Sequence, residues 1–140
     1  MLKEQFNDIL AEFGTFVKCD VVLDDDGFAS FAVDDDVIVN IRFLDASGSI
    51  VAFSPVGAFG DQGDEGEKAL ALLRMNDLGG LSEGFTLALD EVADLVLALD
   101  RRSALEISSA DSLAAWIEAL VRVVRAVRGY FAEHFSEEVA

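Results

Sequence analysis

The sequence predicts an α+β domain with a five-stranded, mainly antiparallel sheet and three helices, in the order α-β-β-β-α-β-β-α. Three observations predict this fold class. Apolar residues recur at helical spacing near both ends of the chain. The short alternating runs between them are joined by Asp- and Gly-rich turns, which favour hairpins over crossovers. Two nearly identical runs, FTLAL at 85–89 and LVLAL at 95–99, predict a second hairpin.

The length of 140 residues is sufficient for one domain with a real core. We assign the domain to residues 1–132 and expect a frayed tail at 133–140. We also expect the folded chain to form a homodimer, because a chain this short leaves part of an apolar sheet uncovered.

The composition excludes several classes of partner. The formal net charge is −17, whereas nucleic acids and anionic membranes attract basic surfaces, so we expect no nucleic-acid partner and no membrane insertion. Cys19 is the single cysteine, which excludes an internal disulfide and a multi-cysteine zinc site. The opening residues interleave charged and apolar side chains. They predict neither a signal peptide nor a membrane span, and we expect a protein of the reducing cytoplasm.

The first element is predicted to be an amphipathic helix that ends near Gly14 and Thr15. Its other face is charged, so the apolar stripe is expected to pack on the core. The stripe consists of Leu2, Phe6, Ile9, Leu10, Phe13 and Val17.

A three-stranded meander follows, with strands predicted at 28–33, 37–44 and 50–54. The turns between the strands are rich in Asp and Gly, which tolerate positive φ. Pro55 is expected to end the third strand because proline lacks the N–H that a sheet ladder requires.

A glycine-rich loop from Gly57 to Gly66 is predicted to join the two halves of the sheet. A helix is expected after it at 67–75, with Leu70 and Leu73 on its apolar side. Asn76 is expected to end this helix.

The second hairpin is predicted to have one bulky and one small face, because alternate residues of a strand point to opposite sides. We assign the bulky face to the core, beneath the last helix. The small face and the apolar side of the middle helix are expected to contact a second subunit. The bulky face comprises Phe85, Leu87, Leu89, Leu95, Leu97 and Leu99, and the small face comprises Thr86, Ala88, Val96 and Ala98.

A long last helix is predicted after a serine cap at 108 or 109. Arg122, Arg125 and Arg128 lie on the side opposite to its apolar stripe. Glu118 precedes Arg122 by four residues, which favours an ion pair within the helix. The apolar stripe consists of Leu113, Trp116, Ile117, Leu120, Val123, Val124, Val127 and Phe131.

Residues that could support catalysis or metal binding are few and poorly placed. His134 is the lone histidine and lies in the charged tail, and Cys19 has no histidine near it in sequence. Neither G-x-S-x-G nor H-E-x-x-H occurs, and the glycine loop lacks the Gly-Lys-Ser/Thr order of a phosphate-binding loop. The aspartate runs at 24–26 and 34–36 place carboxylates consecutively, whereas a calcium loop alternates them. We therefore expect no catalytic residue, no cofactor and no metal.

Phenylalanine is frequent, with 11 residues, and most of them lie in the first half of the chain. Alternation places Phe28 and Phe31 on opposite faces of one strand, so both cannot enter the same one-sided core. One of them is therefore expected either in an exposed apolar groove that binds a partner, or beneath the first helix or a neighbouring subunit. The sequence leaves both alternatives open.

Four stretches of the chain resemble those of one known family. They are GFASFAVDDDVIVNIRF at 27–43, ALALLRMN at 69–76, GFTLALDEVADLVLALD at 84–100 and SLAAWIEALVRVVRAVRGYF at 112–131. In length, acidity and element order, and in the progression from Leu-Leu-x-x-Asn to Leu-Asp-Glu, the chain is similar to the class I chaperones of bacterial type III secretion, the Tir chaperone or CesT-like family.

The resemblance implies a homodimer that binds the N-terminal segment of a secreted effector, holds it extended and unfolded, and presents it for export without ATP. In that family, the middle helix and the adjacent hairpin form the dimer contact, and grooves from the first helix and first strands take client side chains. By position, the implied dimer contact is Leu70, Leu73, Thr86, Ala88, Val96 and Ala98. The implied client groove is Phe6, Phe13, Phe28, Phe31 and Phe43.

Two other functions remain as alternatives. A generic acidic dimeric adaptor would bind a folded regulatory partner, which would keep its own cooperative unfolding when bound. A small enzyme or metal protein has little support in the sequence. The export chaperone is our prediction, since an extended client can add to a sheet edge by backbone hydrogen bonds while pockets select its side chains.

Overall fold

The computed structural model describes residues 2–60, 64–77 and 80–135, and it confirms the predicted fold class and element order. Within these residues, five strands form one sheet, accompanied by three α-helices and a short 3-10 helix. In chain order the elements are α1 (Leu2–Val17), β1 (Phe28–Val33), β2 (Val37–Leu44), β3 (Ser49–Ala58), α2 (Glu65–Met75), β4 (Thr86–Asp90), β5 (Leu95–Ser103), η1 (Ala104–Glu106) and α3 (Ala110–His134).

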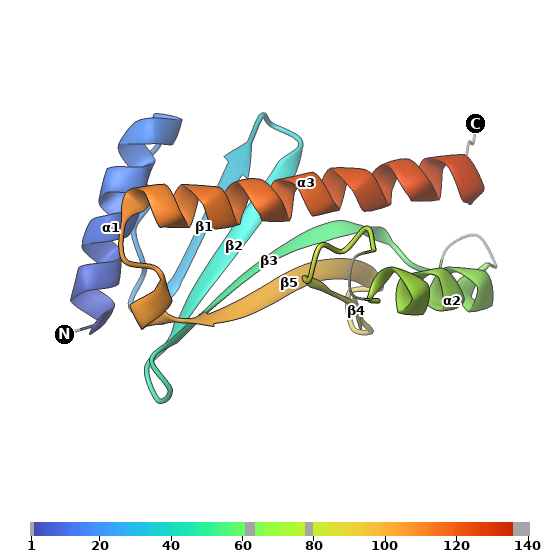
Figure 1. Ribbon diagram of the computed structural model, residues 1–140, viewed down its shortest axis with the longest axis horizontal. Helices are drawn as coiled ribbons and strands as arrows, with labels where there is room; N and C mark the ends of the chain where they lie inside the picture. Colours follow the sequence, from blue (N-terminus) through green and yellow to red (C-terminus); the bar gives the residue numbers. More distant parts are fainter. Residues whose placement is uncertain (1, 61–63, 78–79, 136–140) are drawn as a thin grey trace.

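The sheet has the strand order β1-β2-β3-β5-β4, and all neighbouring strands are antiparallel. α3 runs across one face of the sheet, and α1 packs against α3 near the start of that helix (Figure 1). α2 lies at the other end of the molecule, beside β4. The first and last helices therefore lie on the same face of the sheet.

Pairs of phenylalanine rings hold α1 on the sheet. The ring centroids of Phe6 and Phe43 lie 5.9 Å apart, and those of Phe13 and Phe31 lie 5.4 Å apart. All four side chains are buried. Aromatic pairs at such distances stabilise a core beyond the area that they bury.

The end of α1 differs from the prediction. Gly14 lies within the helix, which continues to Val17, and Lys18 then adopts a positive φ of 59°. The chain folds back so closely that the carbonyl oxygen of Cys19 occupies the space that a side chain at position 14 would need. Gly14 thus permits a close approach of the backbone and does not end the helix.

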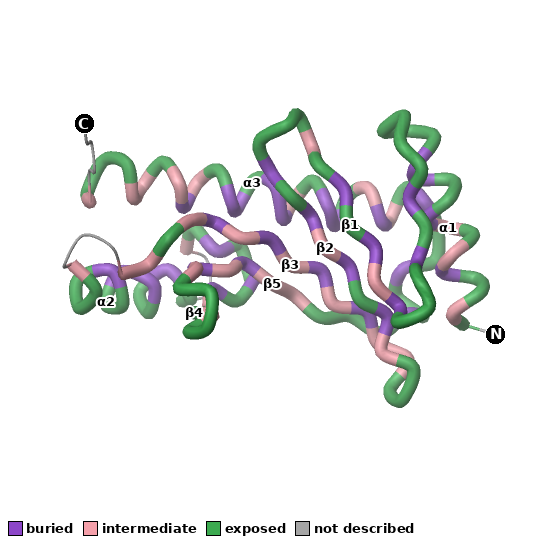
Figure 2. Tube along the Cα trace, turned by 180° about the vertical axis from the view of Figure 1, so that it is seen from behind, coloured by how far each residue is buried: buried purple, intermediate pink, exposed green. Residues whose placement is uncertain are grey.

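Burial alternates along β2, β3 and β5, as Figure 2 shows. The buried residues face α1 and α3, and we call this side the inner face of the sheet. The outer face is also apolar in part, but its large side chains are only half-buried. They include Val51, Phe53, Leu97 and Leu99.

The face assignment of the second hairpin is wrong for β5. The register pairs Leu87 with Ala98 and Ala88 with Leu97, and paired residues share a face. Val96 and Ala98 are 0% exposed on the inner face, whereas Leu97 lies half-buried on the outer face. The turn between β4 and β5 sets this register, and a shift of one residue exchanges the two faces of a strand.

β3 continues past Pro55, contrary to the prediction. β2 pairs with β3 only as far as Phe53, so Pro55 has a paired strand on one side only. Proline is tolerated in a strand where one neighbour is missing. The register with β5 shifts between Pro55 and Gly57, which marks a β-bulge. The sheet divides here, with β1 and β2 diverging from β3 and β5 (Figure 1).

α2 is tied to the sheet at both ends. The side-chain amide of Asn76 accepts a hydrogen bond from the N–H of Leu87 at 2.8 Å and donates one to the carbonyl of Leu87 at 3.0 Å. It thereby makes the pair of bonds that a neighbouring strand would make with β4. Near the other end, the buried Lys68 donates to the carbonyl of Phe59 at 3.1 Å.

α3 begins at the predicted cap, since the Ser109 hydroxyl accepts a hydrogen bond from the N–H of Ser112. Its predicted stripe is buried apart from Phe131, which is half-buried. The indole N–H of Trp116 donates to Asp100 at 2.9 Å, which satisfies the polar group of this large core residue. Among the helices that the structure describes, none is long and apolar enough to cross a membrane.

Candidate functional site

An apolar pocket of about 610 Å³ opens between the second half of α1, the end of β1 and α3. This volume is typical of ligand-binding clefts. The buried Phe13, Ile117 and Val121 belong to its walls, whereas Phe16 is 51% exposed. The lining residues are Phe13, Phe16, Val17, Val33, Asp34, Ala114, Ile117, Glu118, Val121, Arg122 and Arg125.

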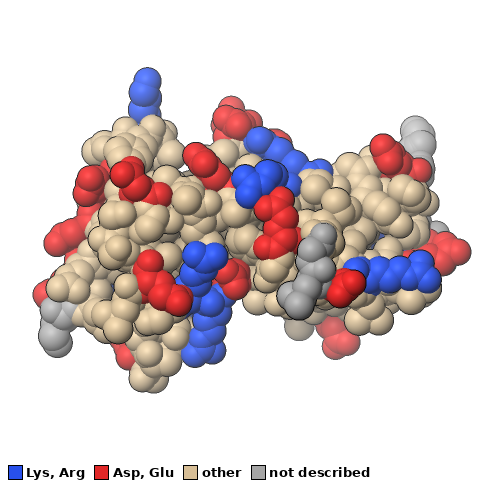
Figure 3. Space-filling view, viewed as in Figure 1, with Lys and Arg blue, Asp and Glu red and all other residues tan. Residues whose placement is uncertain are grey.

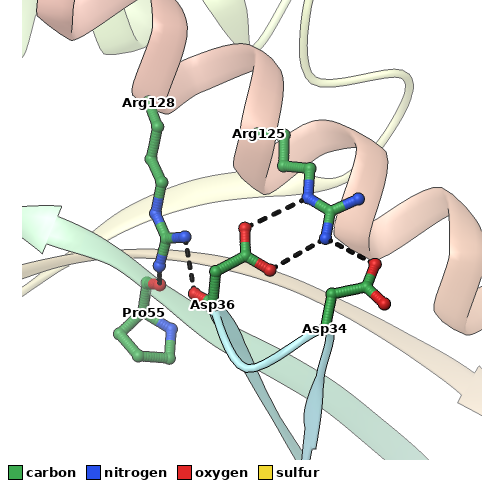
Figure 4. A network of polar contacts seen from close by, with 5 residues as sticks. All are labelled: Asp34, Asp36, Pro55, Arg125 and Arg128. Atoms are coloured by element: carbon green, nitrogen blue, oxygen red, sulfur yellow. Dashed lines mark hydrogen bonds and ion pairs between the residues drawn. The ribbon is translucent and has the colours of Figure 1, made fainter.

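A carboxylate clamp holds one wall of this pocket. The guanidinium of Arg125 binds Asp36 at 2.8 Å and 3.3 Å and Asp34 at 3.0 Å (Figure 4). The hydrogen bonds from Arg125 lower the pKa of Asp36 below its ordinary value, and the two carboxylates raise the pKa of Arg125. The β1–β2 turn is thereby fixed against α3.

A second arginine of α3 fixes the loop before β4. Arg122 forms a bidentate pair with Glu83, with contacts of 2.8 Å to one oxygen and 3.0 Å to the other. This pair lowers the pKa of Glu83 and raises the pKa of Arg122. The predicted partner, Glu118, forms no hydrogen bond or ion pair with any described residue, although its charge also raises the pKa of Arg122.

A third arginine fills the place where the sheet divides. Arg128 donates to the carbonyl of Asp36 at 2.7 Å and to that of Pro55 at 3.3 Å (Figure 4). It also donates to the carbonyl of Val56 at 2.8 Å. These carbonyls come from both sides of the division between β2 and β3. The three arginines were predicted on the side of the helix opposite to its apolar stripe. From there they join α3 to three separate segments.

The space-filling view agrees with this pairing. On the face that carries α3, basic side chains near the middle lie directly beside acidic ones, and further acidic side chains are scattered toward the edges (Figure 3). Much of the remaining surface of this face is uncharged. On this face, the acidic side chains that remain after local pairing thus lie around an uncharged surface.

Four of the five predicted groove residues lie in the interior. Phe6, Phe13, Phe31 and Phe43 are at most 6% exposed, so they do not form an open groove, although Phe13 contributes to the pocket wall. Phe28 is half-buried on the outer face, where the guanidinium of Arg42 lies 4.9 Å from its ring centroid. The prediction that Phe28 and Phe31 occupy opposite faces is confirmed.

The predicted dimer-contact residues also divide into two groups. Leu70, Leu73 and Thr86 are exposed, with Leu73 at 71%, and Ala88 is half-buried. Val96 and Ala98 belong to the inner face and offer no surface to a second copy. The leucines of β5, which were assigned to the core, occupy the outer face in their place.

The residues considered for catalysis lie apart from the pocket. Cys19 is exposed beyond the end of α1, and the ring of His134 stacks on Tyr130 near the end of α3, with centroids 3.9 Å apart. In the part of the chain that the structure describes, no three His, Cys, Asp or Glu side chains are grouped so that they could hold a metal ion.

Sequence reasoning missed Phe16 and the three arginines. Phe16 falls beside the helical stripe that ends with Phe13 and Val17, and a large apolar residue at the border of a stripe is the signal that could have identified it. The arginines recur at every third position of α3, in a chain whose turns are rich in acidic residues. That spacing was visible, but the partners come from positions up to 92 residues away.

Comparison with solved structures finds the same fold in several chains. A chain of the ExsC–ExsE complex is 19% identical, with a TM-score of 0.74, and covers 91% of this chain and 94% of its own. A chain of the HopA1–SchA chaperone–effector complex is 19% identical, with a TM-score of 0.70, and covers 91% and 95%. The structure of the Yersinia pestis type III secretion chaperone SycH with a fragment of YscM2 gives 23% identity and a TM-score of 0.64, covering 87% and 97%.

Comparison with curated proteins gives no match. The model of one protein family, in contrast, matches residues 8–128, which is most of the chain. This match spans the elements from α1 to α3, including the walls of the pocket. The chain belongs to the Tir chaperone protein (CesT) family.

Proposed function

We propose that this protein is a type III secretion chaperone that acts as a homodimer in the bacterial cytoplasm. It binds the N-terminal segment of a secreted effector and keeps that segment soluble, partly unfolded and competent for export. It acts by binding and not by catalysis. The observation that carries the proposal is the open apolar pocket between α1 and α3 in a chain of this family.

The pocket lies where an extended client can be held by its backbone and its side chains together. β1 is an edge strand, and Val33 at its end is one of the pocket's lining residues. A client strand that pairs with the free edge of β1 therefore runs toward the pocket. Backbone pairing supplies affinity without sequence preference, and the pocket supplies the preference.

The outer face of the sheet is the surface that we assign to the homodimer. Phe53 pairs with Leu99 across the sheet, and both are half-buried although their side chains are apolar. Ala88 lies next to Leu97 on the same face, and Leu73 is exposed on α2. Covering this surface with a second copy stabilises the dimer by about 25 cal/mol for each Å² of apolar area that is removed from water.

The client site is tested by filling the pocket. Ala114 lines the pocket, whereas the adjacent Ala115 is exposed on α3 and does not line it. The tagged wild-type chain, isolated from its native host, is expected to retain an effector whose protected region maps by limited proteolysis to its N-terminal part. Ala114→Trp is expected to lose this effector, and Ala115→Trp is expected to keep it. Equal retention by both variants would refute the role of the pocket.

The dimer is tested separately by light scattering on the purified chain. Leu97→Arg and Leu73→Arg are expected to give monomers with wild-type helix content, because each places a charge in an apolar contact. Val92→Arg is the matched control, since Val92 is 99% exposed at the tip of the β4–β5 turn. A wild-type chain that is monomeric at micromolar concentration contradicts the dimer.

The rival adaptor function makes a different prediction for the bound partner. A folded regulator keeps its own cooperative unfolding transition when bound, whereas a client segment held by a chaperone has none. Calorimetry of the purified complex distinguishes these two cases.

A further inference from the structure

We propose that the pocket between α1 and α3 selects client segments in which a large apolar side chain is flanked by lysine or arginine. This inference rests on the proposed function and adds the chemical class of the client. It follows from the charges at the rim of the pocket, because the arginines there are paired with carboxylates of this chain whereas two carboxylates keep unused acceptors.

The floor and the rim of the pocket have different chemistry. Phe13, Ile117 and Val121 give an apolar floor that suits a leucine or phenylalanine side chain. The charged lining residues lie around it, on the β1–β2 turn and on one side of α3. An apolar side chain that enters the pocket therefore brings its sequence neighbours close to charged groups.

The two arginines at the rim are already occupied. Arg122 binds both oxygens of Glu83, and Arg125 binds Asp34 and Asp36. Their six hydrogen bonds to carboxylates of this chain come from the Nε and one terminal nitrogen of each guanidinium. An acidic client residue therefore meets two guanidiniums whose charge is already paired.

Two carboxylates at the rim keep unused acceptors. Asp34 binds Arg125 through one oxygen only, and its side chain is 72% exposed. Glu118 has no hydrogen-bonding or ion-pairing partner within the described residues, because Arg122 turns to Glu83. A carboxylate has about four acceptor sites, so both groups can accept bonds from a client cation.

The net charge of the rim points in the same direction. The charged lining residues are two carboxylates, Asp34 and Glu118, and two guanidiniums, Arg122 and Arg125. With the carboxylates of Asp36 and Glu83, which pair with these arginines, and the neighbouring Arg128, four negative charges stand against three positive ones. Lys18, the nearest lysine in sequence to the α1 wall, lines a different hollow with Cys19. The rim therefore attracts a cation and repels an anion.

The test uses fluorescence anisotropy with three labelled peptides of twelve residues. Each peptide carries one phenylalanine in a Gly-Ser background, with the two flanking positions both Lys, both Ser or both Glu. The full wild-type chain is expected to bind the Lys peptide about tenfold more tightly than the Glu peptide, and the Ser peptide is expected to fall between them. Raising the salt to about 0.5 M should reduce this ratio, because exposed charges are screened.

Two variants assign the preference to the rim. The Asp34→Asn, Glu118→Gln double variant is expected to reduce the ratio to about twofold. Glu118→Gln alone leaves the clamp on Arg125 intact and is expected to reduce the ratio by about half. The control, Asp45→Asn with Glu91→Gln, makes the same change of charge in two distant turns and is expected to keep the full ratio.

Three results would overturn the inference: no binding of any peptide by the wild type, equal binding of the three peptides, or the same loss of ratio in the control as in the double variant. A chain that retains its effector in the pull-down but shows no charge preference refutes this inference and leaves the proposed function intact. A chain that retains no effector, whatever the peptides show, refutes the proposed function.

Discussion

The inner face of the sheet is apolar and buried, whereas the outer face is apolar only in part and its large side chains are half-buried. On the inner face, Val39, Ile41, Ala52, Val96 and Ala98 are all fully buried. On the outer face, the larger side chains of Phe53, Leu97 and Leu99 keep part of their surface in water. The size of a side chain therefore does not by itself identify the core face. α3 brings large side chains such as Trp116 to the sheet, and small residues such as Ala52 and Ala98 complete the close-packed interior there.

The largest expected difference between the two faces comes from placing one charge on each face of β5. Val96→Arg is expected to destabilise the chain by more than about 4 kcal/mol and to prevent folding, because it buries an unpaired charge beneath α3. Leu97→Arg, one residue away, is expected to leave the circular dichroism of a folded monomer. Similar loss of structure in both variants would show that the outer face is covered within the single chain.

Phenylalanine gives the next largest contrast. Phe43→Ala removes a buried ring that packs on Phe6, and it is expected to cost about 3–5 kcal/mol in urea unfolding. Phe28→Ala, on the outer face, is expected to cost less than about 1 kcal/mol, because the half-buried ring leaves no closed cavity. Equal costs would mean that the outer face contributes to the core of the chain.

The next variant concerns Arg128, which lies where β2 and β3 separate. Arg128→Met keeps the apolar stem but removes the donors to the carbonyls of Asp36, Val56 and Pro55, and we expect a cost of about 1–3 kcal/mol. Arg101→Met removes an exposed hydrogen bond to Ser47 and is expected to cost less than about 0.5 kcal/mol. Thermal unfolding of the two variants measures the difference. A cost for Arg101→Met as large as that for Arg128→Met contradicts the stabilising role that we assign to Arg128 between β2 and β3.

The smallest effect concerns pH. The pKa of Asp36 is lowered below its ordinary value of 3.8 by the hydrogen bond from Arg125. A group with a depressed folded pKa stabilises the fold above its ordinary pKa, and the stabilisation is lost as the pH falls through the folded value. The wild type is therefore expected to exceed Arg125→Gln in stability at neutral pH, and the difference should close below pH 3.8. Urea titrations at several pH values follow this difference. A difference that grows with acidity contradicts the clamp.

Local signals were enough to predict most elements. The bounds 28–33 and 37–44 are confirmed for β1 and β2, because their turns consist of residues that favour positive φ, as seen at Asp34 and Asp35. The stripe and serine cap of α3 are also confirmed, because helical spacing and a capping serine are local signals. Each of these features depends on residues within a few positions of one another.

The features that were not predicted depend on distant partners. β3 continues beyond Pro55 because β2 has already separated from it, and no local sequence signal indicates this separation. The faces of β5 depend on the register with β4, and Phe43 is buried because α1 returns to cover it. The candidate site needed Phe16, the arginines of α3 and the turn at Asp34 to be brought together. Their chemistry was visible in the sequence, whereas their proximity was not.

The hydrogen bonds between Asn76 and Leu87 have a consequence for how the protein can polymerise. A sheet with two open edges can add further sheets at both ends and grow into a filament. Here the Asn76 amide occupies the outward N–H and carbonyl of Leu87, which blocks strand addition over part of the β4 edge, while β1 is the opposite edge strand. Two molecules joined through their β1 edges would therefore present two partly blocked β4 edges. One side-chain amide thus limits how far the sheet can grow.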